Sequence, residues 1–525
     1  MPRPRNYFYG LIAAVLLGSL LYGFIAVAQV ANGLYFSIGK GYTDGIPRQL
    51  VRTNADHLYI FTASAQYSSV INVFWTGAAG LPTSAAAFNH STTLTETANP
   101  LSVDAVYDGG TIIHVLVNTN SATANQGTVK DHPFDTATNS FRAPITIDTN
   151  TPTVSGDYIG SSGVSGMVAQ DGLLHVAYWS NSNHITHKAY TYDSLSNTLT
   201  QSGSTTQIDS DGSATHPSIA ISPLDDSITI AWVSEATTDQ ILARSSSDGE
   251  TWGSIEIVSA ATPWTSRNAG VNIDQGPNML ITPDGTRHLL YIEDYDGTGS
   301  YGHVHYVTNS GSGWTDTALN FYSHNPGLAT NYVGDIYLIG HGAVSTGANK
   351  KIYTMKKSSA GTWGTPQQFA TPPNGGSFDA SPSIKWSVVG FNRPETVEFA
   401  FFTPISNNYN NTNIYYGRFS IGGGANPTAT PPPNATPGLH YFSVSQPTLT
   451  WNLISWALGY QIQIDDDPNF GSPVPVPDEF SADILSYMTD SELADGTYYW
   501  HVRAKKNVTD WGSWSAPETF IISAP

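Results

Sequence analysis

The amino-acid sequence predicts an all-β protein in which a long array of repeated strand units is followed by a smaller β domain. Three observations favour this fold class. Charged residues make up only 12% of the 525 residues, against about 25% in typical globular chains, while turn-forming Gly is abundant. A unit of two short apolar strands recurs along most of the chain. A Pro-rich stretch over residues 422–438 separates this array from a tail of alternating apolar and polar residues.

The N-terminus predicts export. Arg3 and Arg5 precede an apolar run from Tyr7 to Ala28, which ends in the small-x-small pattern of signal-peptidase sites. The run also reaches the roughly 20 residues that span a bilayer. Two interpretations of residues 1–30 therefore stay open, a cleaved signal peptide and an uncleaved membrane anchor. In both, the body of the protein is exported and is either secreted or anchored at the cell surface.

The composition excludes several classes of partner. A formal net charge of −20, from 41 acidic and 21 basic residues, opposes binding to nucleic acid or anionic lipid. We therefore expect membrane contact only through an N-terminal anchor. The absence of cysteine excludes disulfides and thiolate metal sites. We expect no cofactor and no metal, because no phosphate-binding glycine loop and no metalloprotease motif occurs.

The repeated unit consists of a turn, an apolar strand, a polar loop and a second strand. Such hairpins bury their faces when they stack as blades around an axis, so the pattern predicts a β-propeller over residues 42–421. Six or seven blades fit, with seven favoured. A series of β-sandwiches is the alternative, but the steady period and the lack of linkers favour the propeller. Equivalent positions in successive copies are Tyr59, Val115, Val176, Ile230, Leu290, Tyr337 and Phe399.

One turn of the array carries a recognisable motif. The run SSDGETW, with Ser246, Asp248, Gly249 and Trp252, resembles the Asp box of sialidases and other BNR-repeat propellers, one residue short of its commonest spacing. Weaker relatives are NSGSGW from Asn309 and SSAGTW from Ser358. The resemblance implies a sialidase-like propeller in which this motif is a structural turn and its Trp packs between blades.

The tail over residues 439–525 resembles a fibronectin type III domain. Trp451 fits its second strand, Tyr460 its third, and the run LADGTYYWHVRA from Leu493 has the tyrosine-corner pattern that precedes the sixth strand. The run WGSWS from Trp511 resembles the WSxWS element of such domains, for which Arg503 is the natural stacking partner; two tryptophans that simply pack are the alternative. The Gly-rich and Pro/Thr-rich residues 422–438 read as a linker, so we expect the two domains to fold separately.

Candidate site residues lie just beyond the first apolar strand of each repeat. Loops at equivalent positions of a propeller open on one face, so these residues are expected to surround one mouth of the channel, opposite the Asp-box turn. The expected ligand-binding face consists of Asn120, Asn181, Glu235, Glu293, Asp294, Tyr295 and His341. The pair His303 and His305 shares a strand face, which predicts either a metal pair or one polar face of a hairpin, and the second is simpler.

Two functions follow from this reading. The favoured one is an exported surface protein whose propeller mouth binds a glycan or an extracellular protein ligand. The alternative is a secreted sialidase-like glycoside hydrolase that uses carboxylates at the mouth as acid and base. The resemblance implies three convergent arginines for a sialidase, yet only the run GIPR ending in Arg48 distantly matches that pattern. The catalytic candidates are Glu235, Asp294, Glu293 and Arg48.

Overall fold

The structure is a computed structural model of the whole chain, and the regular elements of its described part are all β-strands apart from one 3-10 turn at Ala85–Ala87. The prediction of an all-β protein is confirmed. The described residues are 33–40, 50–64, 68–96, 100–119, 127–151, 163–180, 183–210, 212–223, 225–234, 240–259, 277–282, 284–293, 302–311, 313–330, 336–343, 351–357, 361–370, 383–384, 396–405, 408–420, 440–442, 444–451, 459–481, 486–505, 511, 514–515 and 517–523.

The first four sheets are antiparallel and follow one another along the chain. Each uses strands that are consecutive in sequence and joined by short turns, as expected for hairpin repeats. The first sheet consists of β2 (Leu50–Arg52), β3 (Leu58–Ala63), β4 (Val70–Trp75) and β5 (His90–Thr95). The second consists of β6 (Pro100–Tyr107), β7 (Ile112–Thr119), β8 (Gly127–Asp135), β9 (Ser140–Phe141) and β10 (Ile145–Thr151). The third consists of β11 (Val164–Val168), β12 (Leu174–Ser180), β13 (His184–Asp193) and β14 (Thr198–Gln207), and the fourth of β15 (Ala214–Ile221), β16 (Ile228–Ser234), β17 (Gln240–Ser246) and β18 (Glu256–Ile257).

The next sheet contains two repeat units joined by one long strand. The first part of that strand pairs with the strand before it, and the last part pairs with the strand after it, with register shifts on both sides. It therefore ends one unit and begins the next. The strands are β19 (Asn278–Ile281), β20 (Arg287–Ile292), β21 (Gly302–Asn309), β22 (Thr315–Thr330), β23 (Ile336–Ala343), β24 (Lys351–Lys357) and β25 (Gln367–Ala370).

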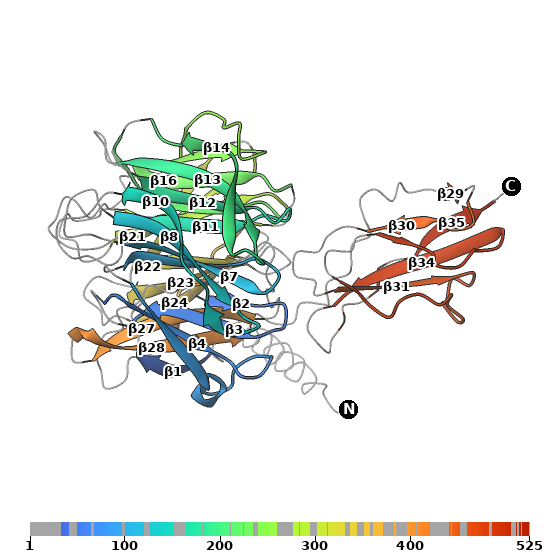
Figure 1. Ribbon diagram of the computed structural model, residues 1–525, viewed down its shortest axis with the longest axis horizontal. Helices are drawn as coiled ribbons and strands as arrows, with labels where there is room; N and C mark the ends of the chain where they lie inside the picture. Colours follow the sequence, from blue (N-terminus) through green and yellow to red (C-terminus); the bar gives the residue numbers. More distant parts are fainter. Residues whose placement is uncertain are drawn as a thin grey trace, which may run out of the picture.

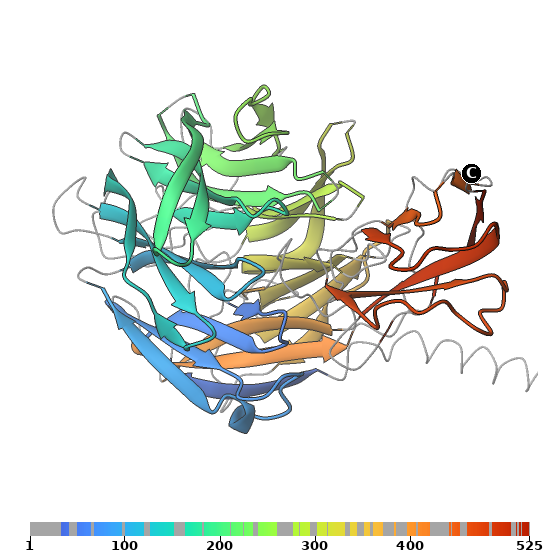
Figure 2. The ribbon, with the colours of Figure 1, turned by 45° about the vertical axis from the view of Figure 1, so that its right-hand side comes forward.

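The last sheet of the array brings together two distant parts of the chain. Its order is β26-β27-β28-β1, so the earliest described strand is its outer edge, and Leu34 pairs with Arg418. Dark blue β1 accordingly lies beside orange β27 and β28 in Figures 1 and 2. The array expected from residue 42 thus also includes β1, which lies before that boundary. The strands are β26 (Ser383–Ile384), β27 (Thr396–Ile405), β28 (Asn408–Ser420) and β1 (Leu34–Lys40).

Neighbouring sheets pack face to face through apolar clusters. Val73 and Val115 share a cluster between the first two sheets, and Ile230 shares one with Ile185 between the third and fourth. In the described residues six such clusters lie between sheets, one of which joins Ile60 of the first sheet to Ile414 of the last, and a seventh lies between the two units of the seven-stranded sheet. A continuous core through successive sheets is the property of a β-propeller, and this part of the chain has that fold.

Polar contacts also link the first strands of adjacent sheets. The hydroxyl of Ser102 on β6 accepts bonds from the N–H groups of Gly163 and Val164, at 3.1 and 3.2 Å. Ser165 on β11 accepts in the same way from Ile219 on β15, at 3.2 Å. The serine hydroxyls thereby provide hydrogen-bond acceptors for backbone N–H groups of the neighbouring sheet. The first strands are thereby tied to one another.

A buried ion pair joins the two ends of the array. The guanidinium of Arg52, which is completely buried, pairs with Asp56 at 2.7 Å and with Glu398 of β27. The hydroxyl of Tyr416 donates to Glu398 at 2.5 Å. A buried charge is tolerated only when it is paired and hydrogen-bonded, as Arg52 is here. This network and the pairing of β1 with β28 connect the first sheet to the last.

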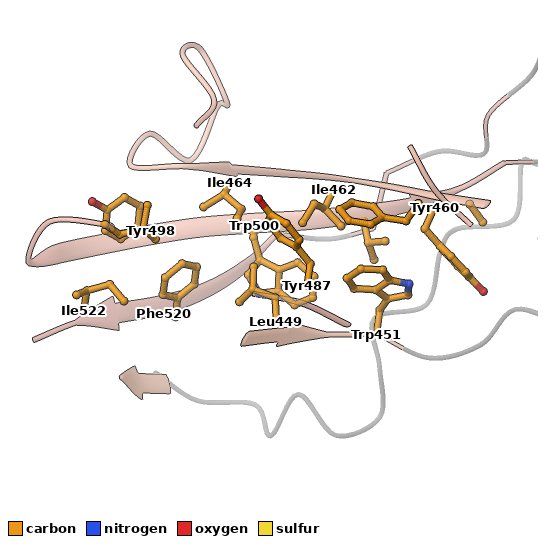
Figure 3. Packing of buried hydrophobic residues seen from close by; sticks show 14 residues of the cluster. Leu449, Trp451, Tyr460, Ile462, Ile464, Tyr487, Tyr498, Trp500, Phe520 and Ile522 are labelled. Carbon is orange, nitrogen blue, oxygen red and sulfur yellow. The ribbon is translucent and has the colours of Figure 1, made fainter. Parts of the chain in front are cut away.

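The tail contains two further sheets around one apolar cluster, shown in Figure 3 with Trp451 and Trp500 among its labelled members. Figure 1 shows these strands, in red, as a group apart from the other sheets. The hydroxyl of Tyr498 donates to the carbonyl of Ala494 at 3.1 Å. One sheet has the order β29 (His440–Phe442), β35 (Glu518–Ile522), β34 (Gly496–Ala504), β31 (Gly459–Asp465) and β32 (Phe480–Ser481), and the other pairs β30 (Thr448–Thr450) with β33 (Ser486–Met488).

One face of the β31–β34 pair carries a ladder of stacked side chains. His501 stacks between Phe470 and Trp514, at ring-centroid distances of 3.7 and 4.1 Å. The guanidinium of Arg503 lies 4.4 Å from the ring centre of Trp514 and 5.0 Å from that of Trp511. Arginine thus lies between both tryptophans, which is the stacking arrangement rather than tryptophans packing alone.

Among the described residues, no helix has the length and apolar character needed to cross a membrane. The N-terminal segment 1–30 and the linker 422–438 lie outside the described residues.

Candidate functional site

The positions expected to form the mouth follow the second strands of successive sheets. Strands β7, β12, β16 and β20 end at Thr119, Ser180, Ser234 and Ile292, directly before Asn120, Asn181, Glu235 and Glu293. The structure describes Glu293 fully. For His341 it describes only the backbone, which pairs within β23. Asn120, Asn181, Glu235, Asp294, Tyr295 and Arg48 lie outside the described residues.

Glu293 lies at the end of β20 beside two histidines of β21. Its Oε2 atom is 3.2 Å from Nε2 of His305 and 3.5 Å from Nδ1 of His303. Its backbone N–H donates to the carbonyl of His303 at 2.9 Å. The Glu293 side chain is 30% exposed, and within the described residues its Oε1 atom takes no hydrogen bond. One carboxylate oxygen therefore contacts both imidazoles, and the carboxylate belongs to a partly exposed side chain.

The imidazole of His305 links Glu293 to a second carboxylate. Its Nδ1 atom lies 2.7 Å from Oδ1 of Asp316 on β22, and both side chains are only 8% exposed. The hydroxyl of Tyr291 donates to Asp316 and lies 3.1 Å from the same Nδ1. Burial would lower the pKa of His305, but the hydrogen bonds and charges of Asp316 and Glu293 outweigh it and raise that pKa.

The strand register explains why these side chains meet. Tyr291 pairs with His305 across β20 and β21, and His305 pairs with Ala318 across β21 and β22. Directly paired residues project to the same face, as do residues two apart, so His303, His305 and Asp316 share one side of the sheet. That side packs on the fourth sheet through Tyr291 and Val307, which cluster with Val233 and Ile241.

The sequence pointed to part of this cluster. The spacing of His303 and His305 indicates a shared face, and the structure places both beside Glu293, as one polar face of the β20–β21 hairpin. No signal in the sequence marks Asp316 or Tyr291, because their meeting depends on the register of three strands. In the described residues no group of three or more His, Asp or Glu side chains could hold a metal ion.

A bulge interrupts the first strand of the fourth sheet near the same end. Thr215 pairs with Val233 and Ser218 with Ala231, so His216 and Pro217 on β15 stand opposite the single residue Trp232 on β16. His216 has a φ of 54°, in the left-handed region that residues other than glycine seldom adopt. Such strained positions concentrate at functional sites, and sequence patterns do not reveal them. The bulge at His216 is a further feature that sequence reasoning missed.

The turn over residues 246–252 lies at the other end of β17 from the loop that contains Glu235. Asp248 accepts bonds from the N–H groups of Glu250 and Thr251, at 2.9 and 2.7 Å. Gly249 has a φ of 75°, which suits glycine, and its carbonyl accepts a bond from the Trp252 indole at 3.1 Å. The network closes the turn within itself, which fits a structural role.

Trp252 reaches from this turn to the third sheet. Its ring lies edge-on to that of His187 at 5.1 Å, and His187 stacks in turn on His175 at 5.3 Å. Burial lowers the pKa of His175 to about 4 and that of His187 to about 3. Both imidazoles are therefore neutral near pH 7 and belong to the core between two sheets. Trp363, in the weaker relative of the motif, packs similarly on Tyr306 of the preceding unit, at 4.9 Å.

Comparisons with known proteins find likeness in structure only. No family model and no curated protein matches the chain. A solved structure of the alpha-L-arabinanase of Penicillium chrysogenum with arabinobiose is 11% identical, with a TM-score of 0.36, and the match covers 73% of this chain and 98% of that one. The GH93 alpha-L-arabinofuranosidase of Fusarium graminearum, also with arabinobiose, is 9% identical, with a TM-score of 0.36 and coverage of 74% and 98%.

AofleA from Arthrobotrys oligospora is 10% identical, with a TM-score of 0.37 and coverage of 65% of this chain and 94% of that one. At these TM-scores and identities, the neighbours' ligands and activities carry no argument about this chain. The candidate site therefore rests on its own geometry.

Proposed function

We propose that this is an exported protein whose seven-bladed propeller binds a glycan at one mouth of its channel, with a fibronectin type III-like domain as an accessory. Glu293 carries the proposal. A partly exposed carboxylate is suited to accept a hydrogen bond from a sugar hydroxyl when its Oε2 atom contacts two imidazoles and its Oε1 atom takes no hydrogen bond within the described residues. It also belongs to the set of loop positions that the repeat register directs to one mouth.

The blade count and the accessory domain have separate support. Seven apolar clusters between successive units, six of them between sheets, and a strand β1 that completes the last sheet support a ring of seven blades, in which β22 serves two of them. Tyr498 donating to Ala494 fits a tyrosine corner, and Arg503 between Trp511 and Trp514 fits a WSxWS-type ladder. The self-contained turn at 246–252 supports a BNR-type, sialidase-like propeller.

Binding to a glycan array, together with hydrolysis of a fluorogenic sialoside and a fluorogenic arabinofuranoside, tests the function. The Glu293→Gln variant, and the double variant Glu235→Gln/Asp294→Asn, should bind the array about 10- to 100-fold more weakly, because a charge-assisted hydrogen bond contributes about 1.5–3 kcal/mol. Neither parent nor variants should hydrolyse the substrates.

The matched control is Glu250→Gln, in the turn at the opposite end of β17, which should bind like the parent. Turnover that the mouth variants abolish would establish the glycosidase alternative instead. If Glu250→Gln abolished binding while the mouth variants matched the parent, the functional face would be the other one.

A further inference from the structure

We propose that His305 is a positioning residue that fixes Glu293 for an uncharged, hydroxyl-bearing ligand and, through Asp316, makes ligand binding depend on pH. The inference rests on the proposed function, since it takes Glu293 as the group that contacts the glycan. It adds the chemical class of the ligand and the control of ligand binding by pH.

The first step is geometric. His305 lies between two carboxylates, with Nδ1 2.7 Å from Asp316 and Nε2 3.2 Å from Glu293. All three residues come from adjacent strands of one sheet or its immediate end, so the sheet register sets their spacing. Side chains that need precise placement are held best by such rigid elements and by buried hydrogen-bonded partners. His305 and Asp316 supply that support for Glu293.

The second step concerns the ligand. Oε2 of Glu293 contacts His305 and His303, and within the described residues Oε1 takes no hydrogen bond. When His305 is protonated its positive charge partly offsets the carboxylates of Glu293 and Asp316, so an ammonium group gains less attraction at this point. A hydroxyl group needs only one acceptor and no net charge. A neutral oligosaccharide therefore fits the site better than a cationic peptide.

The third step is the direction of the pH effect. A protonated imidazole donates from both nitrogens, to Asp316 and to Glu293, whereas a neutral one donates from only one. The shorter contact to Asp316 keeps the remaining proton at Nδ1, so deprotonation releases Glu293. Because the pKa of His305 is raised above its ordinary 6.5, the hold on Glu293 is complete at and below that value. Affinity is expected to fall as pH rises through the raised pKa.

Polar groups surround His305 on its own sheet, and apolar groups face it from the next. Among the described side chains, His303, Tyr291 and Tyr322 are further titratable groups near it on its side of the sheet, with His303 stacked on Tyr322 at a ring distance of 4.3 Å. The facing fourth sheet contributes Val233, Ile241 and Val258 to the same interface. The next described charged pair, Arg287 with Glu256 at 3.6 Å, involves the opposite end of β20.

The first experiment needs no ligand. Titration of the imidazole signals by NMR in the full-length protein should show His305 with a pKa above 6.5, and Asp316→Asn and Glu293→Gln should each lower it. A His305 pKa at or below 6.5 in the parent, or one that neither variant changes, would overturn the proposal. This result does not depend on which glycan binds.

The second experiment measures binding to an array of neutral oligosaccharides that includes arabinobiose, from pH 5 to pH 9. The parent should lose about tenfold in affinity as His305 deprotonates, since one hydrogen bond to a charged group is lost. His305→Gln should bind with a nearly flat pH profile, and the isosteric Asp316→Asn should move the midpoint to lower pH. The control His90→Gln, on an exposed outer strand, should keep the parent's profile.

A parental pH profile in both His305→Gln and Asp316→Asn would refute the positioning role. If His305→Gln does not fold, the pH profile of Asp316→Asn still tests the positioning role. This variant is expected to fold, because asparagine has the same shape as the aspartate it replaces. A parent that binds no oligosaccharide would refute the proposed function alone, while the NMR titration would still judge the link between His305, Asp316 and Glu293.

Discussion

His175 and His187 are buried neutral side chains that stack on each other under Trp252, between the third and fourth sheets. In the unfolded chain an imidazole titrates near 6.5, whereas burial holds these two at pKa values of about 4 and about 3. As pH falls from about 6.5, these two imidazoles bind protons in the unfolded chain but stay neutral in the folded one. Their stabilising contribution is therefore complete above pH 6.5 and is lost as pH falls toward 3.

This difference predicts an acid-sensitive propeller. His175 alone should account for a loss on the order of 3 kcal/mol between pH 6.5 and pH 4. Urea unfolding of the parent and of His175→Gln/His187→Gln across this range measures it. The double variant is expected to be less stable at pH 7 but to lose less of its stability on acidification. Equal slopes against pH in the two proteins would contradict the assignment.

At the scale of single residues, sequence reasoning succeeded where chemistry is local. The turn at 246–252 can be predicted from the sequence because the hydrogen bonds of Asp248 and the positive φ of Gly249 involve only neighbouring residues. The spacing of His303 and His305 likewise shows that they share a face. Asp316 and Tyr291 could not be chosen in advance, because only the pairing of β20, β21 and β22 brings them to His305.

Strand β1 contributes to two inter-sheet clusters at once. Phe36 packs on Tyr416 at 5.4 Å and on Phe88 at 6.3 Å, toward the first sheet. Its neighbour Tyr35 lies 6.2 Å from Phe401, in the cluster on the other side of the last sheet. Alternation along the strand sends successive side chains to opposite faces. Strand β1 therefore packs in the apolar clusters on both faces of the last sheet and stabilises the junction between the two ends of the array.

Shortening Phe36 tests this role. Phe36→Ala should cost about 2 kcal/mol, less than the roughly 3–5 kcal/mol of a fully buried Phe, because Phe36 is only partly buried. Urea unfolding monitored by tryptophan fluorescence measures the change. The control is Ser37→Ala, whose exposed side chain lies on the same strand and should matter by less than about 0.5 kcal/mol. Equal stability of the two variants would mean that β1 does not fasten the junction.

At the scale of elements, the repeat alignment located the second strand of every unit. Its equivalent positions fall in β3, β7, β12, β16, β20, β23 and β27. The alignment missed β1, because a lone strand without a partner nearby in sequence has no repeat to align with. It also gave no sign that β22 would run without interruption from one unit into the next, since its two register shifts reflect packing between units.

The apolar cluster of the tail draws only on tail residues, from Leu449 to Ile522. The clusters of the propeller likewise use only residues before the linker, so each part has a core of its own. We expect two unfolding transitions in scanning calorimetry. Proteolytic cutting between residues 422 and 438 should leave both transition temperatures within about 1 °C of the intact protein's, since little stability crosses a linker.

A single transition that splits or shifts after cutting would instead show that the two parts stabilise each other. The tail's ladder around Arg503 offers an internal reference for this measurement. Trp511 and Trp514 stack on Arg503, so the transition that a Trp511→Phe variant shifts belongs to the tail.

The pairing of Leu34 with Arg418 also fixes an order of events during synthesis. A chain leaves the ribosome at about 5 to 20 residues per second, so β1 emerges tens of seconds before its partner β28 exists. During that interval the alternating apolar strand LYFSIGK has an unmatched edge, the kind of surface that pairs with other nascent chains. We therefore expect correct folding to require that β1 is kept from pairing with other chains until β28 has been synthesised.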